Sequence, residues 1–172
     1  MNKGGRVWLF GDDIDTDVLA PGLFMKGPIE ELARHCLEAV DPSFAGNVMS
    51  GDIIVAGTNF GIGSSREQAP QILKLLGVSA IVARSYGGIF YRNAMNLGLL
   101  AVTCNEVPKL AAGDQAIVHG EQGLISNLTT GEKFNCEAVP AHMMEMIAAG
   151  GLVPFLEIQF ADQKNKKEEQ SL

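Results

Sequence analysis

The hydrophobic and polar positions of the first 110 residues alternate between compact apolar runs and longer mixed stretches. Four apolar runs have the length of buried strands: residues 6–10, 52–56, 79–83 and 99–104. Three intervening stretches have the character of helices: residues 29–40, 66–77 and 87–98. Strands that alternate with helices through short joints imply parallel pairing. This half of the chain is therefore predicted to be an α/β unit with a parallel sheet.

The period changes after Gly113, where short strand-like runs are separated by glycine-bearing turns. The predicted strands lie at residues 115–120, 123–128 and 132–139. A last helix is predicted at 140–151 with a glycine stop, and residues 162–172 form a charged tail that we expect to fray. With no internal repeat and no long linker, we expect one α/β domain with a mixed sheet at residues 1–161, followed by a C-terminal tail.

Composition narrows the functional class. Hydrophobic residues make up 47% of the 172 residues, which is enough for a packed core. A net charge of −7 disfavours nucleic-acid binding. The three cysteines are widely spaced, which favours a reducing cytoplasm over a disulfide framework. No run approaches the roughly 20 apolar residues of a membrane helix, and the N-terminal run is too short for a signal peptide.

The most informative loop is NFGIGSSREQAP, residues 59–70. Its glycines let backbone N–H groups turn toward one point, and an arginine at a predicted helix start adds a planar donor suited to a carboxylate. The loop is neither a Walker A motif nor GxGxxG. It predicts a site for a small anion. The alternative is a plain helix cap, in which Ser64 or Ser65 satisfies first-turn amides.

Two further stretches stand out. GDDIDTDVLAPG, residues 11–22, places four aspartates within six residues, which repel one another unless something binds or separates them. It lacks the calcium-binding DxDxDG pattern, and its alternative is a solvated acidic loop. ARSYGGIFYRNAMNLGLL, residues 83–100, carries aromatic residues that we assign to the core, with Arg84, Arg92 and Asn93 as polar exceptions.

Together these three stretches resemble the motifs of the small, or swivel, subunits of the aconitase superfamily, which include isopropylmalate isomerases and homoaconitases. The likeness spans about residues 5–160, in the same order and at similar separations. It implies a three-layer β/β/α swivelling domain. It also implies a hydro-lyase that dehydrates and rehydrates a hydroxy dicarboxylic acid, active only with a large subunit. The resemblance places a 4Fe-4S cluster in that partner, and this chain has no cluster motif of its own.

The resemblance also assigns roles to individual residues. Ser64 matches the catalytic serine, which as an alkoxide removes the proton next to a carboxylate. Ser65 and Arg66 match substrate-binding positions, and we place Gly63 with them. Asp17 matches a supporting acidic residue that positions a neighbour. A free hydroxyl is too weak a base at neutral pH, so amides and a guanidinium must stabilise the anion. No metal ligand is assigned.

The substrate follows less directly. In the family, the segment that corresponds to LFMKG, residues 23–27, reads the variable group of the substrate. Phe24 and Met25 suit an isopropyl group, whereas Lys26 stands where an arginine would pair with an extra carboxylate. We take 3-isopropylmalate, in leucine biosynthesis, as the leading substrate. Homoaconitate-type acids and 2,3-dimethylmalate stay open, as does a non-catalytic module that binds a small anion.

Overall fold

The computed structural model describes residues 4–169, without the side chains of Pro108, Asp162 and residues 165–169. Within this range seven strands form a sheet in the order β4-β3-β2-β1-β5-β6-β7. The strands are β1 (Gly5–Leu9), β2 (Ile53–Ala56), β3 (Ala80–Ala83), β4 (Leu100–Thr103), β5 (Gln115–His119), β6 (Leu124–Asn127) and β7 (Lys133–Asn135). The helical segments are α1 (Thr16–Leu19), η1 (Gly22–Phe24), α2 (Ile29–Arg34), α3 (Phe44–Asn47), α4 (Gln68–Leu75), α5 (Gly88–Asn96), η2 (Val107–Lys109), α6 (Ala141–Ala148) and α7 (Leu152–Glu169).

The predicted mixed sheet is confirmed. Strands β1 to β4 pair in parallel, with Val7 opposite Ile53 in β1 and β2. The later strands pair antiparallel, and β5 joins the two halves through β1. Every residue of β2 and β3 is buried, as expected for strands of a parallel sheet that is covered on both faces.

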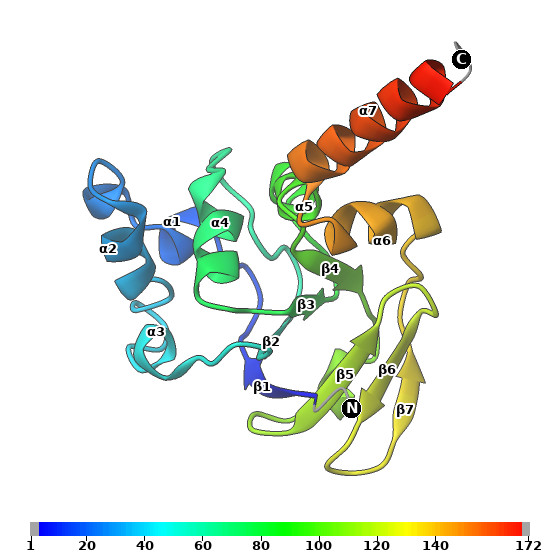
Figure 1. Cartoon of the computed structure of the whole chain (residues 1–172). Helices are drawn as coiled ribbons and strands as arrows, with labels where there is room; N and C mark the ends of the chain where they lie inside the picture. Colours follow the sequence, from blue (N-terminus) through cyan, green and yellow to red (C-terminus); the bar gives the residue numbers. More distant parts are fainter. Residues whose placement is uncertain (1–3, 170–172) are drawn as a thin grey trace.

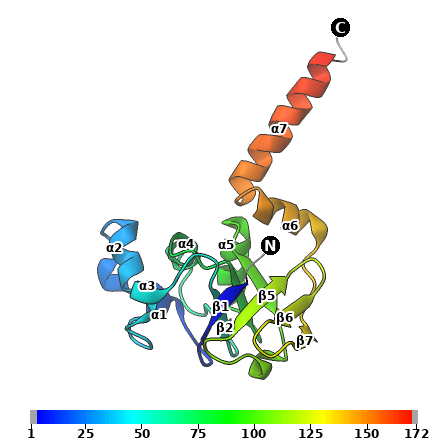
Figure 2. The same ribbon diagram turned by 60° about the horizontal axis from the view of Figure 1, so that its bottom comes forward.

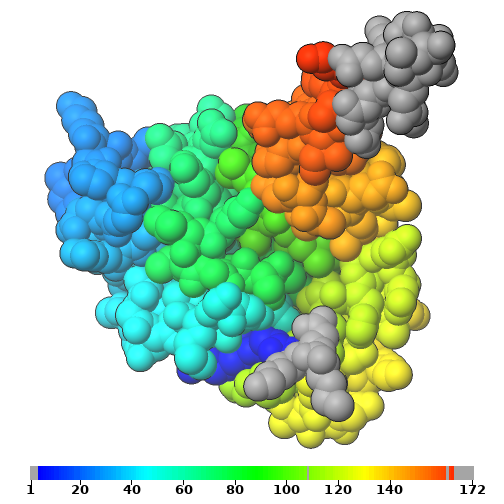
Figure 3. Space-filling model, viewed as in Figure 1, coloured from blue at the N-terminus to red at the C-terminus, as the bar shows by residue number. Residues whose placement is uncertain are grey.

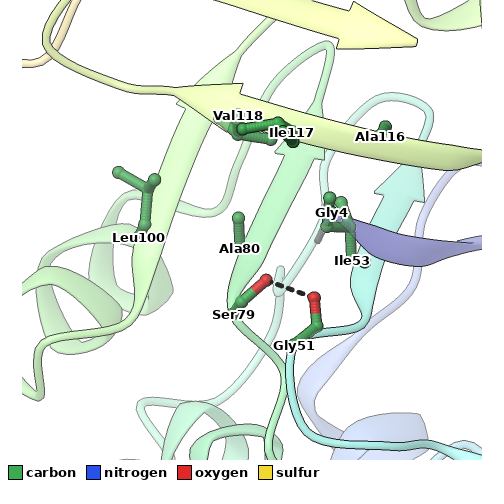
Figure 4. Close-up of a pocket in the computed structure, with 10 residues that line it drawn as sticks. Gly4, Gly51, Ile53, Ser79, Ala80, Leu100, Ala116, Ile117 and Val118 are labelled. Carbon is green, nitrogen blue, oxygen red and sulfur yellow. Dashed lines mark hydrogen bonds between the residues drawn. The ribbon is translucent and has the colours of Figure 1, made fainter. Parts of the chain in front are cut away.

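The antiparallel half curls over the parallel half, which gives the second β layer of the predicted three-layer domain. A cavity of about 160 Å³ lies between the first residues of β2, β3 and β4 and the middle of β5 (Figure 4). Leu100 of β4 and Val118 of β5 both line it, although β4 and β5 are separated by three strands in the sheet order. Only a curled sheet brings these two side chains to one cavity.

Helices form the third layer. Helices α2, α4 and α5 follow one another as neighbours, and α5 also contacts α6 and α7 (Figures 1 and 2). The surface view shows the segment that contains α2, in blue, lying against α4 (Figure 3). The core between helices and sheet contains fully buried aromatic side chains, among them Phe44 and Phe60.

The helix predicted at residues 29–40 is shorter than expected and ends at Arg34. Beyond it, Leu37 has a left-handed backbone (φ 61°), which no helix can continue. Its N–H donates to Val18 O at 3.0 Å, and its side chain is completely buried. The apolar stripe was therefore real, but a long-range hydrogen bond and burial, rather than helical propensity, decide the path of residues 35–40.

The prediction of a last helix at residues 140–151 is wrong in one respect. The glycine stop is present, since Gly150 and Gly151 both have positive φ (98° and 128°). Helix α7 then follows and extends away from the sheet (Figures 1 and 2). It passes residue 161 and includes residues 162–169 of the expected tail, whereas 170–172 lie outside the described residues. The division of the chain after residue 161 stays a prediction.

No described helix is by itself both long and apolar enough to cross a membrane. Residues 141–148 and 152–161 meet the length and composition test only when they are joined, although the two helices are bent by 94°.

A close approach of backbone to side chain holds the loop after β2 in place. Gly61 has φ 75°, and a Cβ at this position would lie 2.1 Å from Cγ of Phe90. On its other side, a Cβ on Gly87 would lie 2.5 Å from Gly61 O. Both the conformation and the available space therefore require glycine at position 61.

We predict that Gly61→Ala lowers the free energy of unfolding by about 3 kcal/mol or more, because it adds backbone strain to a clash with a buried ring. Chemical denaturation of the purified chain measures this. Gly88→Ala is the matched control, since a Cβ there meets nothing within 4 Å and alanine favours the helix. Equal stability of both variants would contradict the packing described here.

Candidate active site

The loops that follow β1 and β2 are joined by backbone hydrogen bonds at the carboxyl end of the parallel strands. Asp13 N–H donates to Thr58 O at 2.8 Å, Gly61 N–H to Ile14 O at 2.7 Å, and Thr16 N–H to Ile62 O at 2.9 Å. The acidic loop and the serine loop therefore lie side by side. Ligand sites of open parallel sheets are found at this end of the strands.

The third motif completes the arrangement. Phe60 N–H donates to Ser85 O at 3.0 Å, and Gly87 N–H donates to Phe60 O at 2.8 Å. The Phe60 ring packs edge-on against Phe90, with ring centroids 5.3 Å apart. Phe90 is buried, which confirms its predicted place in the core. All three sequence motifs thus meet at one end of the sheet.

Two aspartates that the sequence did not assign fix the serine loop. Thr58 N–H and Oγ1–H both donate to Asp12 Oδ1, at 2.6 and 3.0 Å. Asn59 Nδ2 donates to Asp13 Oδ1 at 2.8 Å, and both of these residues have left-handed backbones (φ 58° and 56°). Asp and Asn tolerate that region better than most residues, which is a sequence signal that could have pointed to Asp13 and Asn59. The hydrogen bonds from Thr58 hold the pKa of Asp12 below its ordinary value.

The other two aspartates also have partners. Asp15 caps helix α1 by accepting from Val18 N–H at 2.8 Å. Asp17 forms an ion pair with Arg66 through Nη1, which also donates to Ala20 O at 2.8 Å. No acceptor in the described part of the chain meets Nε or Nη2 of Arg66. The Nε–Nη2 edge of this guanidinium therefore keeps its hydrogen-bonding capacity for a carboxylate, although the side chain is only 17% exposed.

The structure places Gly63, Ser64 and Ser65 at the surface, between the acidic loop and α4. Gly63 has φ 102°, and a Cβ there would lie 3.2 Å from the buried Oγ1 of Thr16. Within residues 4–169, neither the Ser64 hydroxyl nor the backbone amides of Ser64 and Ser65 donate a hydrogen bond. These polar groups are free to meet a ligand or a partner chain.

Arg66 stands two residues before helix α4, not at its first turn as expected. The helix begins at Gln68, and its cap Glu67 makes no side-chain capping bond, so neither serine caps it. Ala69 N–H already donates to Arg66 O, and Pro70 has no N–H. The helix terminus therefore offers fewer donors than the sequence suggested, and the loop amides and Arg66 are the main positive groups.

Lys26 lies in the turn after η1, exposed and without an ion pair to any described residue. Its neighbours Phe24 and Met25 pack against the core, whereas Leu23 is 86% exposed. The start of this segment lies close to Arg66, because a Cβ on Gly22 would be 3.7 Å from Nη2 of Arg66. The segment thus lies next to the serine loop, but its Phe24 and Met25 side chains pack inward against the core.

Metal ligands are not gathered anywhere in residues 4–169, where no group of three or more His, Cys, Asp or Glu side chains could hold an ion. All three cysteines are free thiols. Cys36 and Cys104 are buried, and burial raises the pKa of the Cys136 thiol to about 11. Burial raises the pKa of all three thiols, and thiols kept protonated do not fit the ligand set of an iron–sulfur cluster.

Comparison with known proteins agrees with this geometry. The family described as "Aconitase C-terminal domain" matches residues 33–107. The chain is 47% identical to the 3-isopropylmalate dehydratase small subunit of Heliobacterium modesticaldum, over 95% of this chain and 100% of that protein. It is 46% identical to the 2,3-dimethylmalate dehydratase small subunit of Eubacterium barkeri, over 93% of this chain and 97% of that protein.

A solved structure is also similar. The crystal structure of 3-isopropylmalate dehydratase (leuD) from Methanocaldococcus jannaschii aligns with a TM-score of 0.87 at 40% sequence identity. The alignment covers 94% of this chain and 97% of that chain. This similarity confirms the predicted fold class. At 40% identity it also supports membership of the same family.

Asp12 gives a test of how the loops are held. Its folded-state pKa lies below the ordinary 3.8, so its contribution to stability is complete above that value and is lost as the pH falls through the folded-state pKa. In Asp12→Asn the amide oxygen still accepts from Thr58 but does not titrate. We predict that the stability difference between wild type and this variant shrinks on acidification.

The free energy of unfolding, measured by urea denaturation from neutral pH to below 3.8, reports this difference. Asp12→Ala is the control, because it removes the acceptor and should be less stable than Asp12→Asn at neutral pH. A difference between wild type and Asp12→Asn that grows on acidification would contradict the assignment.

Proposed function

The chain belongs to the family of 3-isopropylmalate dehydratase small subunits within the aconitase family, and from this membership we propose a specific role for it. With a large subunit it forms a hydro-lyase that dehydrates and rehydrates a hydroxy dicarboxylic acid through an alkene. The leading substrate is 3-isopropylmalate, which places the enzyme in leucine biosynthesis in the cytoplasm. A 2,3-dimethylmalate or homoaconitate-type substrate is the alternative.

One observation supports the proposal: an exposed serine stands two residues before an arginine whose guanidinium is held by Asp17 and Ala20 O. Asp17 and Ala20 O occupy Nη1 of Arg66, so its orientation is set before any ligand arrives. Preorganised donors stabilise a developing charge without reorganisation at the moment of reaction. Asp17 therefore positions Arg66, and Arg66 binds the substrate.

In this proposal Ser64 is the base. Its alkoxide removes the proton from the carbon next to a substrate carboxylate and becomes a neutral hydroxyl, while the C–O bond on the neighbouring carbon breaks, hydroxide leaves and the alkene forms. Rehydration returns both the hydroxide and the proton. Arg66 holds that carboxylate along its open Nε–Nη2 edge, with Gly63 allowing the close backbone approach. The Ser65 amide and hydroxyl, together with the Ser64 amide, stabilise the negative charge. Closure of the site against a partner would exclude water and strengthen these interactions.

The partner must supply what this chain lacks. The resemblance implies a 4Fe-4S cluster that would serve as a Lewis acid for the substrate hydroxyl, and the protonated thiols described above do not fit its ligation here. We therefore propose that the cluster is bound by the large subunit. The edge formed by residues 11–27 and 59–70 carries the proposed substrate groups, so this edge is the one that faces the large subunit.

Reconstitution tests the proposal. We predict that the chain alone is inactive and that its complex with a cluster-bearing large subunit dehydrates 3-isopropylmalate. Ser64→Ala should lower kcat by about a hundredfold or more, since it removes the base, while leaving assembly intact. Absorbance of the alkene product measures turnover, and size-exclusion chromatography measures assembly.

Ser50→Ala is the matched control, an exposed serine before β2 at the opposite end of the strand. It should keep wild-type turnover. Hydrogen exchange of the assembled complex should show new protection at residues 11–27 and 59–70. A complex that dehydrates no hydroxy dicarboxylate, or a fully active Ser64→Ala complex, would refute the assignment.

Lys26 distinguishes the substrates. An exposed lysine contributes little to binding an isopropyl group but would pair with an extra carboxylate. We predict that Lys26→Met keeps kcat/KM for 3-isopropylmalate within about threefold. A panel of 3-isopropylmalate, 2,3-dimethylmalate and homoaconitate-type acids measures this. Turnover of a tricarboxylate that Lys26→Met abolishes would instead assign the chain to the homoaconitate-type enzymes.

A further inference from the structure

The segment Gly22–Gly27 has few backbone contacts to hold it in place. Within the described residues its backbone hydrogen bonds are local: Phe24 N–H to Pro21 O at 3.1 Å, Met25 N–H to Gly22 O at 3.4 Å, and Gly27 N–H to Phe24 O at 3.1 Å. Such bonds shape the turn but do not fix its orientation on the domain. That orientation must come from side-chain contacts.

The most specific of these contacts is made by His35, the residue that ends helix α2. Its imidazole stacks face to face on the Phe24 ring, with centroids 3.5 Å apart and planes within 2° of parallel. Helix α2 belongs to the helical layer and packs beside α4, so His35 stands on a fixed element. The stack links the turn at Gly22–Gly27 to that element.

Two carboxylates hold the imidazole in this orientation. His35 Nδ1 lies 2.7 Å from Glu38 Oε2, and Nε2 lies 3.5 Å from Glu31 Oε1. Carboxylates only accept hydrogen bonds, so Nδ1 donates to Glu38, and the Glu31 carboxylate near Nε2 also favours the protonated ring. The hydrogen bond to Glu38 is the largest of the effects that raise the pKa of His35. A cationic ring on an aromatic face adds an attraction that a neutral ring lacks.

We infer that His35 is a positioning residue, which clamps Phe24 and thereby sets the direction of the segment that reads the variable group of the substrate. This inference rests on the proposed function. With Phe24 turned toward α2, Leu23 and Lys26 are the side chains of the segment left exposed. Because Gly22 adjoins Arg66, a rotation of the turn would move both side chains relative to the bound carboxylate.

The chemistry of the clamp predicts where its loss is felt. Ser64 and Arg66 do not depend on Phe24, so the proton transfer should be unaffected. The variable group of the substrate would lose its fixed wall. A hydrophobic wall distinguishes substrates that differ by a methylene by roughly tenfold or more, and loosening it lowers that ratio.

The experiment uses the complex with the large subunit and the variants His35→Ala and His35→Phe. His35→Ala should lower the ratio of kcat/KM for 3-isopropylmalate over 2,3-dimethylmalate by about fivefold, mainly through KM, with kcat within about twofold. His35→Phe keeps an aromatic ring on Phe24 and should restore most of the ratio. His142→Ala, an exposed histidine of α6, is the matched control and should match wild type.

A second measurement needs no activity. Hydrogen exchange at the amides of Phe24, Met25 and Gly27 in the isolated chain should be about threefold or more faster in His35→Ala, with residues 59–70 unchanged. Unaltered exchange would overturn the clamp, and faster exchange with an unaltered substrate ratio would overturn its role in substrate choice. A wild-type complex inactive on both acids would refute the proposed function, while the exchange result would still decide the clamp.

Discussion

The contact between the backbone of Gly61 and the ring of Phe90 sets the geometry of everything at the carboxyl end of the sheet. Only a residue without a Cβ, in a left-handed conformation, lets the loop after β2 lie flat on α5. In that position its N–H donates to Ile14 O, and the next residue receives Thr16 N–H. The acidic loop and the serine loop are therefore adjacent because one glycine permits close packing.

The same adjacency explains how four aspartates share six residues. Each one meets a different partner: Asp12 accepts from Thr58, Asp13 from Asn59, Asp15 from the first turn of α1, and Asp17 pairs with Arg66. Their charges are distributed over separate hydrogen-bond donors instead of converging on one cation. The acidic loop therefore holds the serine loop in place, and hydrogen bonds and one ion pair stabilise its closely spaced negative charges without a metal ion.

The serine loop is therefore firmly held, whereas a neighbouring turn is held less firmly. The serine loop is held by backbone hydrogen bonds to the acidic loop, and Arg66 by Asp17, whereas the backbone hydrogen bonds described for the turn at Gly22–Gly27 are local. Under the proposed function, the proton transfer that all hydroxy acid substrates share depends on the serine loop, and the choice among these substrates can vary with the turn. Under the proposed function the domain needs a partner because the proposed substrate-binding groups lie on an exposed edge, where water would otherwise compete for every donor.

Local periodicity was enough to predict the strands, the parallel pairing in the first half and a mixed sheet, because hydrophobic spacing records burial directly. Sequence alone did not predict that residues 35–40 leave the helical path, that α7 follows the glycine stop, or that Asp12, Asp13 and His35 fix loops. Each of these depends on a contact between residues distant in the chain or on different elements, such as Leu37 with Val18 or His35 with Phe24. The sequence determined which residue types were available for the site, and the tertiary structure decided which side chains face solvent, because only packing removes the alternatives.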